Sequence, residues 1–243
     1  MSNPPVLVPL DRTITDPDIP ALRRVTSPLT RLMRRLVRVE WHGQRHLRSG
    51  GMVVAANHIS YADFLSLGHF VLGAGRWPHF LGKESLFRLP VAGRVITACE
   101  QIPVHRGTSR AGEALTSAVA AVRQGKAVLI YPEGTVTKDP DGWPMAGRHG
   151  AVRMALQTGC PLVPVAQWGA QAFMPGPKPS LPRPFPRKTF QVMAGPPLDL
   201  EPYRDQPVTA ELLSTVTDVL MARITDLLAT LRGAEPPAQP YQV

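Results

Sequence analysis

Residues 52–63 read MVVAANHISYAD and determine how the chain is organised. The apolar run Met52–Ala56 has the length and composition of a short buried strand. Beyond Asp63 the apolar residues recur at spacings of three and four, which predicts a helix. His58 therefore lies at a strand-to-helix junction, where a rigid scaffold can hold a side chain at a cleft. A reversed loop at His58 would bring its ring to the Asp63 carboxylate.

Two interpretations of His58 and Asp63 are open from this stretch alone. A carboxylate on one imidazole nitrogen fixes the tautomer and leaves the other nitrogen free to accept a proton. The pair would then be a catalytic general base and its positioning acid. The alternative is a hydrogen bond at the start of a helix, without any chemistry. The other motifs of the chain favour the catalytic interpretation.

The chain has 243 residues, of which 44% are hydrophobic, enough for one α/β domain with a full core. Strands alternate with helical segments, which predicts a mixed, partly parallel sheet flanked by helices. The predicted strands are 52–56, 78–82, 101–105, 127–131, 161–166 and 188–194, and the predicted helices lie near 60–74, 109–124, 147–158 and 208–232. We expect an arm and helix over 1–40, one folded domain over 41–233 and a disordered tail over 234–243.

The composition restricts the kind of partner. The 27 basic and 18 acidic residues give a formal net charge of +9, which suits a phosphate-bearing partner. Arginines interleaved with aromatic residues are lacking, so no nucleic acid is expected. No metal-type spacing and no glycine-rich phosphate loop occur, so neither a metal nor a nucleotide cofactor is expected. Cys99 and Cys160 are far apart and are interpreted as reduced residues of a cytosolic protein.

Residues 22–38 predict a basic amphipathic helix that begins near Ser27 and Pro28. Its two faces are an apolar stripe of Leu29, Leu32, Met33, Leu36 and Val37 and a basic face of Arg31, Arg34, Arg35 and Arg38. We interpret it as lying in an anionic membrane surface, because a merely solvated face usually mixes both signs of charge. The alternative is an ordinary helix docked on the core. Without a signal peptide or a spanning segment, we expect a peripheral protein on the cytoplasmic side of the plasma membrane.

Two further blocks place polar residues at strand ends. The strand around Ile102 runs into Arg106, at the carboxyl end where open α/β sheets bind ligands. The strand at 127–131 is ended by Pro132, so Glu133, Gly134 and Thr135 emerge at its carboxyl end. Gly134 allows the backbone to approach a ligand closely. Taken singly, the first block favours a surface arginine before a loop, and the second is equally a tight turn with a solvated glutamate.

Together these blocks resemble the lysophospholipid acyltransferase family, whose bacterial members make phosphatidic acid from 1-acyl-glycerol 3-phosphate. The matches follow the family order over roughly residues 40–200: Asn57, His58 and Asp63 of N-H-x₄-D, Lys83–Phe87 similar to K-x-E-L-F, Arg106 after an apolar strand, Pro132–Thr135 of P-E-G-T, and Val163–Val165 of V-P-V. The glycine and phenylalanine that the family usually has upstream of its arginine are absent here.

The resemblance implies a 1-acylglycerol-3-phosphate O-acyltransferase, with 41–233 as its acyltransferase domain. Its donor would be acyl-coenzyme A or acyl-carrier protein, and its acceptor the sn-2 hydroxyl of 1-acyl-sn-glycerol 3-phosphate. His58 would be the general base and Asp63 its partner. Arg106 and Lys83 would bind the acceptor phosphate. The Glu133–Thr135 turn would line the same pocket.

One departure keeps other functions open. The family commonly has arginine after P-E-G-T, and this chain has Val136. Lys138 or Arg148 would then supply the cation, or the acceptor would be glycerol 3-phosphate, another lysophospholipid or a glycolipid hydroxyl. The alternative from another class is a non-catalytic lipid-binding module.

Overall fold

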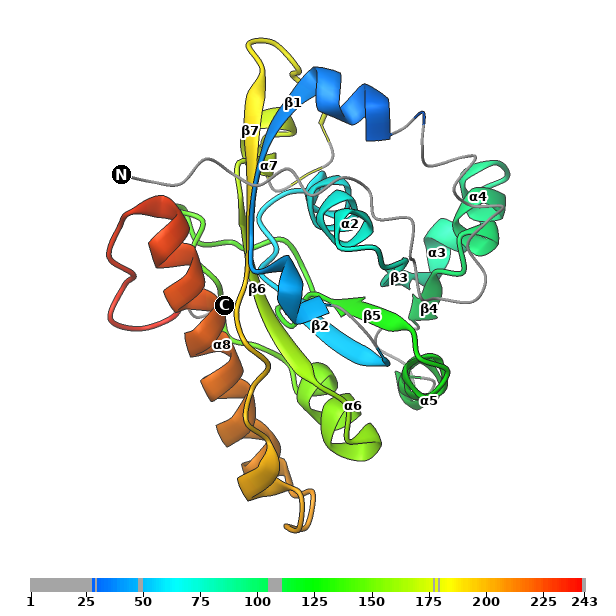
Figure 1. The fold of residues 1–243 in the computed structure, drawn as a ribbon, viewed down its shortest axis with the longest axis vertical. Coiled ribbons are helices and arrows are strands. Elements are labelled where there is room, and N and C mark those ends of the chain that lie inside the picture. The colour runs from blue at the N-terminus through cyan, green and yellow to red at the C-terminus, as the bar shows by residue number, and fades with distance from the viewer. Residues whose placement is uncertain are drawn as a thin grey trace.

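The computed structural model describes residues 28, 30–47, 50–104, 111–176, 178 and 180–241. The strands among these residues form one seven-stranded sheet in the order β1-β7-β6-β2-β5-β3-β4. Helices flank the sheet (Figure 1). The predicted fold class, an α/β domain with a mixed and partly parallel sheet, is confirmed.

The direction of the strands defines the edge at which the site lies. The parallel strands are β2 (Met52–Ala56), β3 (Pro78–Lys83), β4 (Ile102–Val104), β5 (Ala127–Ile130) and β6 (Leu162–Trp168). They all end at one edge of the sheet, here called the carboxyl edge. The strands β1 (Val37–His42) and β7 (Lys188–Ala194) pair parallel to each other, and β7 is antiparallel to β6. The connections that precede β1 and β7 therefore also lie at the carboxyl edge.

The helices connect these strands, and two short 3-10 helices, η1 (Gln44–Leu47) and η2 (Glu201–Tyr203), complete the described elements. The α-helices are α2 (Asp63–Gly73), α3 (Glu84–Phe87), α4 (Ala92–Ala98), α5 (Ala111–Arg123), α6 (Gly150–Thr158), α7 (Ala170–Phe173) and α8 (Ala210–Arg232). Thr209 caps α8 by accepting a hydrogen bond from the amide of Leu212. None of the described helices has both the length and the apolar character that crossing a membrane requires.

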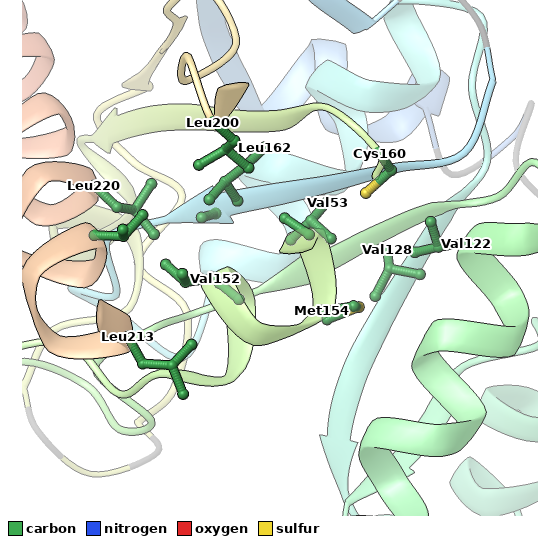
Figure 2. Packing of buried hydrophobic residues seen from close by; sticks show 14 of the residues in the cluster. Val53, Val122, Val128, Val152, Met154, Cys160, Leu162, Leu200, Leu213 and Leu220 are labelled. Atoms are coloured by element: carbon green, nitrogen blue, oxygen red, sulfur yellow. The ribbon is translucent and has the colours of Figure 1, made fainter. Parts of the chain in front are cut away.

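Side chains of β2 alternate between two cores. Val53 and Ala55 join a cluster to which α5, α6 and α8 contribute, and Figure 2 shows Val53 in this packing. Met52 and Val54 join a second cluster that includes side chains of α2. Because both faces are covered, β2 is apolar throughout, as is usual for central parallel strands. This rigid strand ends directly before Asn57 and His58.

The sequence predicted the central strands well and the beginning of the chain less well. The predictions 52–56 and 188–194 coincide with β2 and β7. The assignment of Val37 to the N-terminal helix is wrong, because helical residues 30–36 are followed directly by β1, where Val37 pairs with Lys188. The short α3 and α4 are absent from the sequence prediction.

The helical residues 30–36 use much of their apolar stripe within the protein. Met33 is buried, as is Val37 just beyond it, in a cluster with Phe173 and Phe190. Leu32 is half exposed, and the exposed arginines flank it (Arg31, Arg34, Arg35 and Arg38). The stripe thus packs partly on the core, the alternative that the sequence left open. Residues 22–27 and Leu29 lie outside the described residues.

The limits of the predicted domain stay a prediction, although two contacts near them are described. Residues Val37–His42 form β1 and are part of the sheet. At the other end, Tyr241 forms an isolated parallel bridge with Met145. Cys99 and Cys160 are both free cysteines.

Candidate active site

His58 and Asp63 are in direct contact at the carboxyl edge. The Nδ1 atom of His58 lies 2.8 Å from Oδ2 of Asp63. The same carboxylate oxygen accepts hydrogen bonds from the backbone amides of Ile59 (2.7 Å) and Ser60 (2.9 Å). The loop after β2 turns back on itself, so the first residue of α2 reaches the histidine five positions earlier. The structure therefore brings together the pair that the spacing predicted.

This contact assigns different roles to the two imidazole nitrogens. With Nδ1 donating to Asp63, Nε2 is left as the proton acceptor. The side chain of His58 is 18% exposed, whereas that of Asp63 is fully buried. Burial raises the pKa of the Asp63 carboxyl, and the hydrogen bonds from His58 and the two amides act in the opposite direction. A buried acid behind a partly exposed imidazole is the arrangement of a general base with a positioning partner.

Glu133 is buried and holds backbone instead of presenting a free carboxylate. Its Oε1 accepts from the amide of His58 (2.8 Å), and its Oε2 accepts from the amide of Met145 (3.0 Å). Burial raises the pKa of Glu133 from 4.5 to about 8, although these two hydrogen bonds act against the rise. The glutamate thus ties the histidine loop to the segment around Met145, a role that the sequence did not predict.

The backbone of His58 is held on both sides by the segment after β5. Its carbonyl oxygen accepts a 2.7 Å hydrogen bond from the amide of Thr137, and its amide donates to Glu133. Gly134 between them has a φ of +74°, a left-handed conformation that favours glycine. A Cβ at Gly134 would lie 2.9 Å from Nε of Arg148, so the guanidinium packs directly on this turn.

The other predicted site residues are placed as follows. Lys83 is exposed at the end of β3, where it pairs with Val104 of β4. Thr135 is exposed on the turn after Glu133. Val136 is buried, so no cation occupies the position where the family has arginine. Arg106 lies outside the described residues.

Tyr131 is a site residue that sequence analysis missed. Its ring stacks on that of His58, with 4.2 Å between centroids and 12° between planes. Burial raises the pKa of its hydroxyl well above the ordinary value. The stack fixes the plane of the imidazole, whereas Asp63 fixes its rotation. The available signal was an aromatic residue at the end of an apolar strand, directly before Pro132.

Asn57 and Gln167 join the ends of β2 and β6. The Asn57 side chain donates to the Gln167 carbonyl (3.0 Å) and accepts from its amide (2.8 Å). The Gln167 side chain donates in turn to the Asn57 carbonyl (3.0 Å). Both residues are fully buried, so each one supplies hydrogen bonds that water cannot supply to the other. A glutamine near the end of an otherwise apolar strand was the signal in the sequence.

The segment that supports His58 is itself fixed to the last turn of α8. The guanidinium of Arg232 lies between two indole rings, 4.0 Å from the centroid of Trp143 and 4.2 Å from that of Trp168. Cations prefer the faces of such rings. The carbonyl of Trp143 accepts from the Thr137 hydroxyl (2.7 Å), which connects this sandwich to the amide that holds His58.

Among the described residues, no group of three or more His, Cys, Asp or Glu side chains is placed to hold a metal ion. The prediction that no cofactor is used stays a prediction.

Known proteins with similar sequences share part of this chain. The sequence model of the Acyltransferase family matches residues 38–168. The 1-acyl-sn-glycerol-3-phosphate acyltransferase BAT2 of Brassica napus chloroplasts is 32% identical over 124 residues, 51% of this chain and 34% of that protein. The 1-acyl-sn-glycerol-3-phosphate acyltransferase of Borreliella burgdorferi is 29% identical over 127 residues, 52% of this chain and 49% of that protein. The matched segment thus spans half or less of each of these relatives.

A solved structure has a similar fold over most of the chain. The 1-acyl-sn-glycerophosphate acyltransferase PlsC of Thermotoga maritima superimposes with a TM-score of 0.66 at 20% identity. The superposition covers 91% of this chain and 86% of that one. At this identity the likeness concerns the fold alone.

Proposed function

The chain belongs to the Acyltransferase family, and from that premise we propose that it acylates the sn-2 hydroxyl of 1-acyl-sn-glycerol 3-phosphate to give phosphatidic acid. The observation that carries the proposal is the 2.8 Å contact between Nδ1 of His58 and the buried carboxylate of Asp63. It leaves Nε2 available as the base for a hydroxyl nucleophile. The names of the relatives from Brassica napus and Borreliella burgdorferi support this choice of acceptor.

In the proposed reaction, Nε2 of His58 removes the proton of the acceptor hydroxyl as its oxygen attacks the thioester carbonyl. The tetrahedral intermediate collapses, the carbon–sulfur bond breaks, and the thiolate receives the proton from the imidazolium. The products are an ester and a free thiol. A positioned general base contributes about 10²–10⁴-fold to such a step. Asp63 stabilises the imidazolium that forms in between.

Binding of the acceptor is assigned to the other residues that the resemblance implies. Arg106 and Lys83 would hold the phosphate by charge-assisted hydrogen bonds. Gly134 and Thr135 would contact the glycerol, and Glu133 would act through the backbone that it holds. The amides of Ile59, Ser60, Ala62 and Asp63 all donate within the loop, so none of these four is assigned to the oxyanion.

The acyl donor in this proposal is acyl-coenzyme A or acyl-carrier protein, and no cofactor takes part. We place the enzyme peripherally on the cytoplasmic side of the plasma membrane, with residues 22–38 against the anionic lipid surface. The exposed Leu32 and its flanking arginines support that contact. The positive net charge of the chain adds long-range attraction.

A different acceptor is the second candidate, and the buried Val136 favours it. A buried valine cannot bind the phosphate in place of an arginine. Arg148, packed on Gly134, and the exposed Lys138 are the described candidates to replace it. If no cation replaces the arginine, the acceptor would be a glycolipid hydroxyl or another lysophospholipid.

The deciding experiment measures transfer from labelled acyl-coenzyme A and acyl-carrier protein to a panel of acceptors. The panel includes lysophosphatidate, glycerol 3-phosphate, lysophosphatidylcholine and monoacylglycerol, with His58→Ala as the paired variant. We expect turnover of lysophosphatidate that His58→Ala abolishes while its circular dichroism spectrum stays unchanged. Turnover of lysophosphatidylcholine or of the phosphate-free monoacylglycerol, without turnover of lysophosphatidate, would establish the second candidate. Absence of turnover on every acceptor, with vesicle binding intact, would identify a lipid-binding module.

A further inference from the structure

The segment after β3 folds into a helical hairpin that directs its aliphatic side chains away from the protein. This α3–α4 hairpin comprises residues 84–98. Val91 is 76% exposed and Val95 53%, and Leu86 and Leu89 are nearly half exposed. No residue of α3 is buried, and only Gly93 of α4 is. Short helices normally bury their apolar side chains, so this arrangement needs an explanation.

The hairpin closes through backbone contact instead of through these side chains. A Cβ at Gly93 would lie 2.1 Å from the carbonyl oxygen of Phe87, so only glycine permits this close approach. The amide of Gly93 donates to the carbonyl of Leu89 (2.9 Å). The Phe87 ring packs on Gly82 of β3, to which it anchors the hairpin. Val91 and Val95 therefore contribute little to holding the hairpin together.

The hairpin lies at the same edge of the sheet as His58. It follows β3, whose carboxyl end is aligned with those of β2 and β5. Of the twelve exposed large hydrophobic residues in the described chain, nine lie on connections at this edge. Besides the four in the hairpin they are Leu32, Tyr61, Phe64, Leu181 and Phe185. Val208 precedes α8, whose beginning lies far from α3 and α4 (Figure 1).

The charge of the hairpin is predominantly positive. Lys83, Arg88 and Arg94 are exposed on it or directly before it. The one acidic residue in this stretch is Glu84, which pairs with Arg88 at 2.5 Å. Exposed aliphatic side chains beside the cations Lys83 and Arg94 complement a layer of anionic headgroups above acyl chains. A second copy of the same chain would place like charges against each other.

We propose that the α3–α4 hairpin is a membrane-contact surface that inserts Leu89, Val91 and Val95 between the headgroups of an anionic lipid layer. The contact positions His58 at the layer, where an acylated acceptor resides. The role of this contact in acyl transfer rests on the proposed function. The membrane contact itself is inferred from the hairpin alone. It would be a second membrane contact besides the one proposed for residues 22–38. In that segment Met33 and Val37 are buried and so do not face lipid.

The test compares two pairs of valines in the full chain. One variant is Val91→Ser/Val95→Ser on the hairpin, and the matched control is Val208→Ser/Val219→Ser, at residues 49% and 39% exposed. Flotation with phosphatidylcholine vesicles, with and without phosphatidylglycerol, measures binding. We expect the hairpin variant to lose about tenfold in affinity for the anionic vesicles and the control to keep it. Unchanged circular dichroism excludes misfolding, and Val91→Ala/Val95→Ala gives an intermediate loss.

Each outcome either supports or overturns the proposed membrane contact. Equal vesicle binding by the hairpin variant and the wild type overturns the proposal, as does an equal loss in the control. A change of oligomeric state in gel filtration without a change in vesicle binding overturns it in favour of a second copy. Acyl transfer is measured separately, as the ratio of turnover on vesicle-borne and on water-soluble short-chain acceptors, which falls in the hairpin variant. If no protein transfers acyl groups but the hairpin variant loses vesicle binding, the surface stands and the proposed reaction fails.

Discussion

Two connections at the carboxyl edge of the sheet differ in which kind of side chain they bury and which they expose. The loop that carries His58 buries the Asp63 carboxylate, and one of its oxygens, Oδ2, receives three donors. The α3–α4 hairpin exposes its apolar groups and closes through Gly93. The loop is organised inward, to hold one imidazole in one position. The hairpin is organised outward, with Val91 and Val95 exposed among the described residues.

The contrast separates two requirements of an enzyme that acts on a lipid. A general base must be held in position before the substrate arrives, which buried and satisfied hydrogen bonds achieve. Contact with a lipid layer requires apolar side chains that stay exposed on the protein surface in the absence of lipid. Substitutions in the loop should therefore change turnover or stability, and substitutions in the hairpin should change neither unless lipid is present.

The largest effect is expected from breaking the inward arrangement at Asp63. Asp63→Asn keeps the shape but presents an amide to Nδ1 of His58 and so favours the wrong tautomer. We expect kcat/KM for acyl transfer to fall by about 10²–10⁴-fold. Steady-state kinetics measure it, with Asp218→Asn on the exposed side of α8 as the control. A loss of less than tenfold would refute the role of the carboxylate.

An intermediate effect is expected at Glu133, in stability and with a defined pH dependence. Glu133→Gln cannot accept from both amides, and an unsatisfied buried group costs about 1–3 kcal/mol. Because burial raises the pKa of Glu133 from 4.5 to about 8, the folded protein holds this proton more tightly than the unfolded chain does. The stabilisation from this group is therefore present at low pH and is lost as the pH rises through that interval.

Urea unfolding of the wild type and Glu133→Gln at a series of pH values tests this sign. The destabilisation caused by the substitution is expected to be larger at the acidic end of the interval than at its alkaline end. A difference that stays constant across the interval would show that Glu133 is ionised in both the folded and the unfolded state there and that its pKa is not raised.

The smallest effect is expected in the hairpin and sharpens the comparison. Val91→Ser should change the free energy of unfolding by no more than about 0.5 kcal/mol, because its side chain is mostly exposed. Val71→Ser in α2 buries a hydroxyl in a closed core and should cost about 1–3 kcal/mol. Thermal unfolding of both variants without lipid measures the difference. Equal losses would mean that the hairpin packs against the protein in solution.

The same contrast explains which parts of the fold the sequence predicts. Strands β2 and β7 are predicted with their full bounds, because their apolar residues face a core and the spacing of apolar residues in the sequence reflects this. The α3–α4 hairpin is missed because its apolar residues face no core and do not recur at the spacing of a buried helix face. Val37 is misassigned because helical spacing happens to continue into the first residue of β1.

The site follows a related rule. The contact of His58 with Asp63 is predicted because it is local, five residues apart within one loop. The stack with Tyr131 and the link from Asn57 to Gln167 join separate strands, and only the order of strands in the sheet places them together. The support that Glu133 gives to the His58 backbone has the same cause, since it spans the ends of β2 and β5.

The bridge between Tyr241 and Met145 has a practical consequence for handling the protein. Met145 donates to Glu133, and Glu133 accepts from His58, so three successive contacts connect the end of the described chain to the proposed base. A purification tag or a deletion at the carboxyl terminus is therefore a change close to the chemistry. Arg232, between its two indole rings, retains part of that support when the bridge is removed. A carboxyl-terminal tag should therefore be removed before activities of variants are compared.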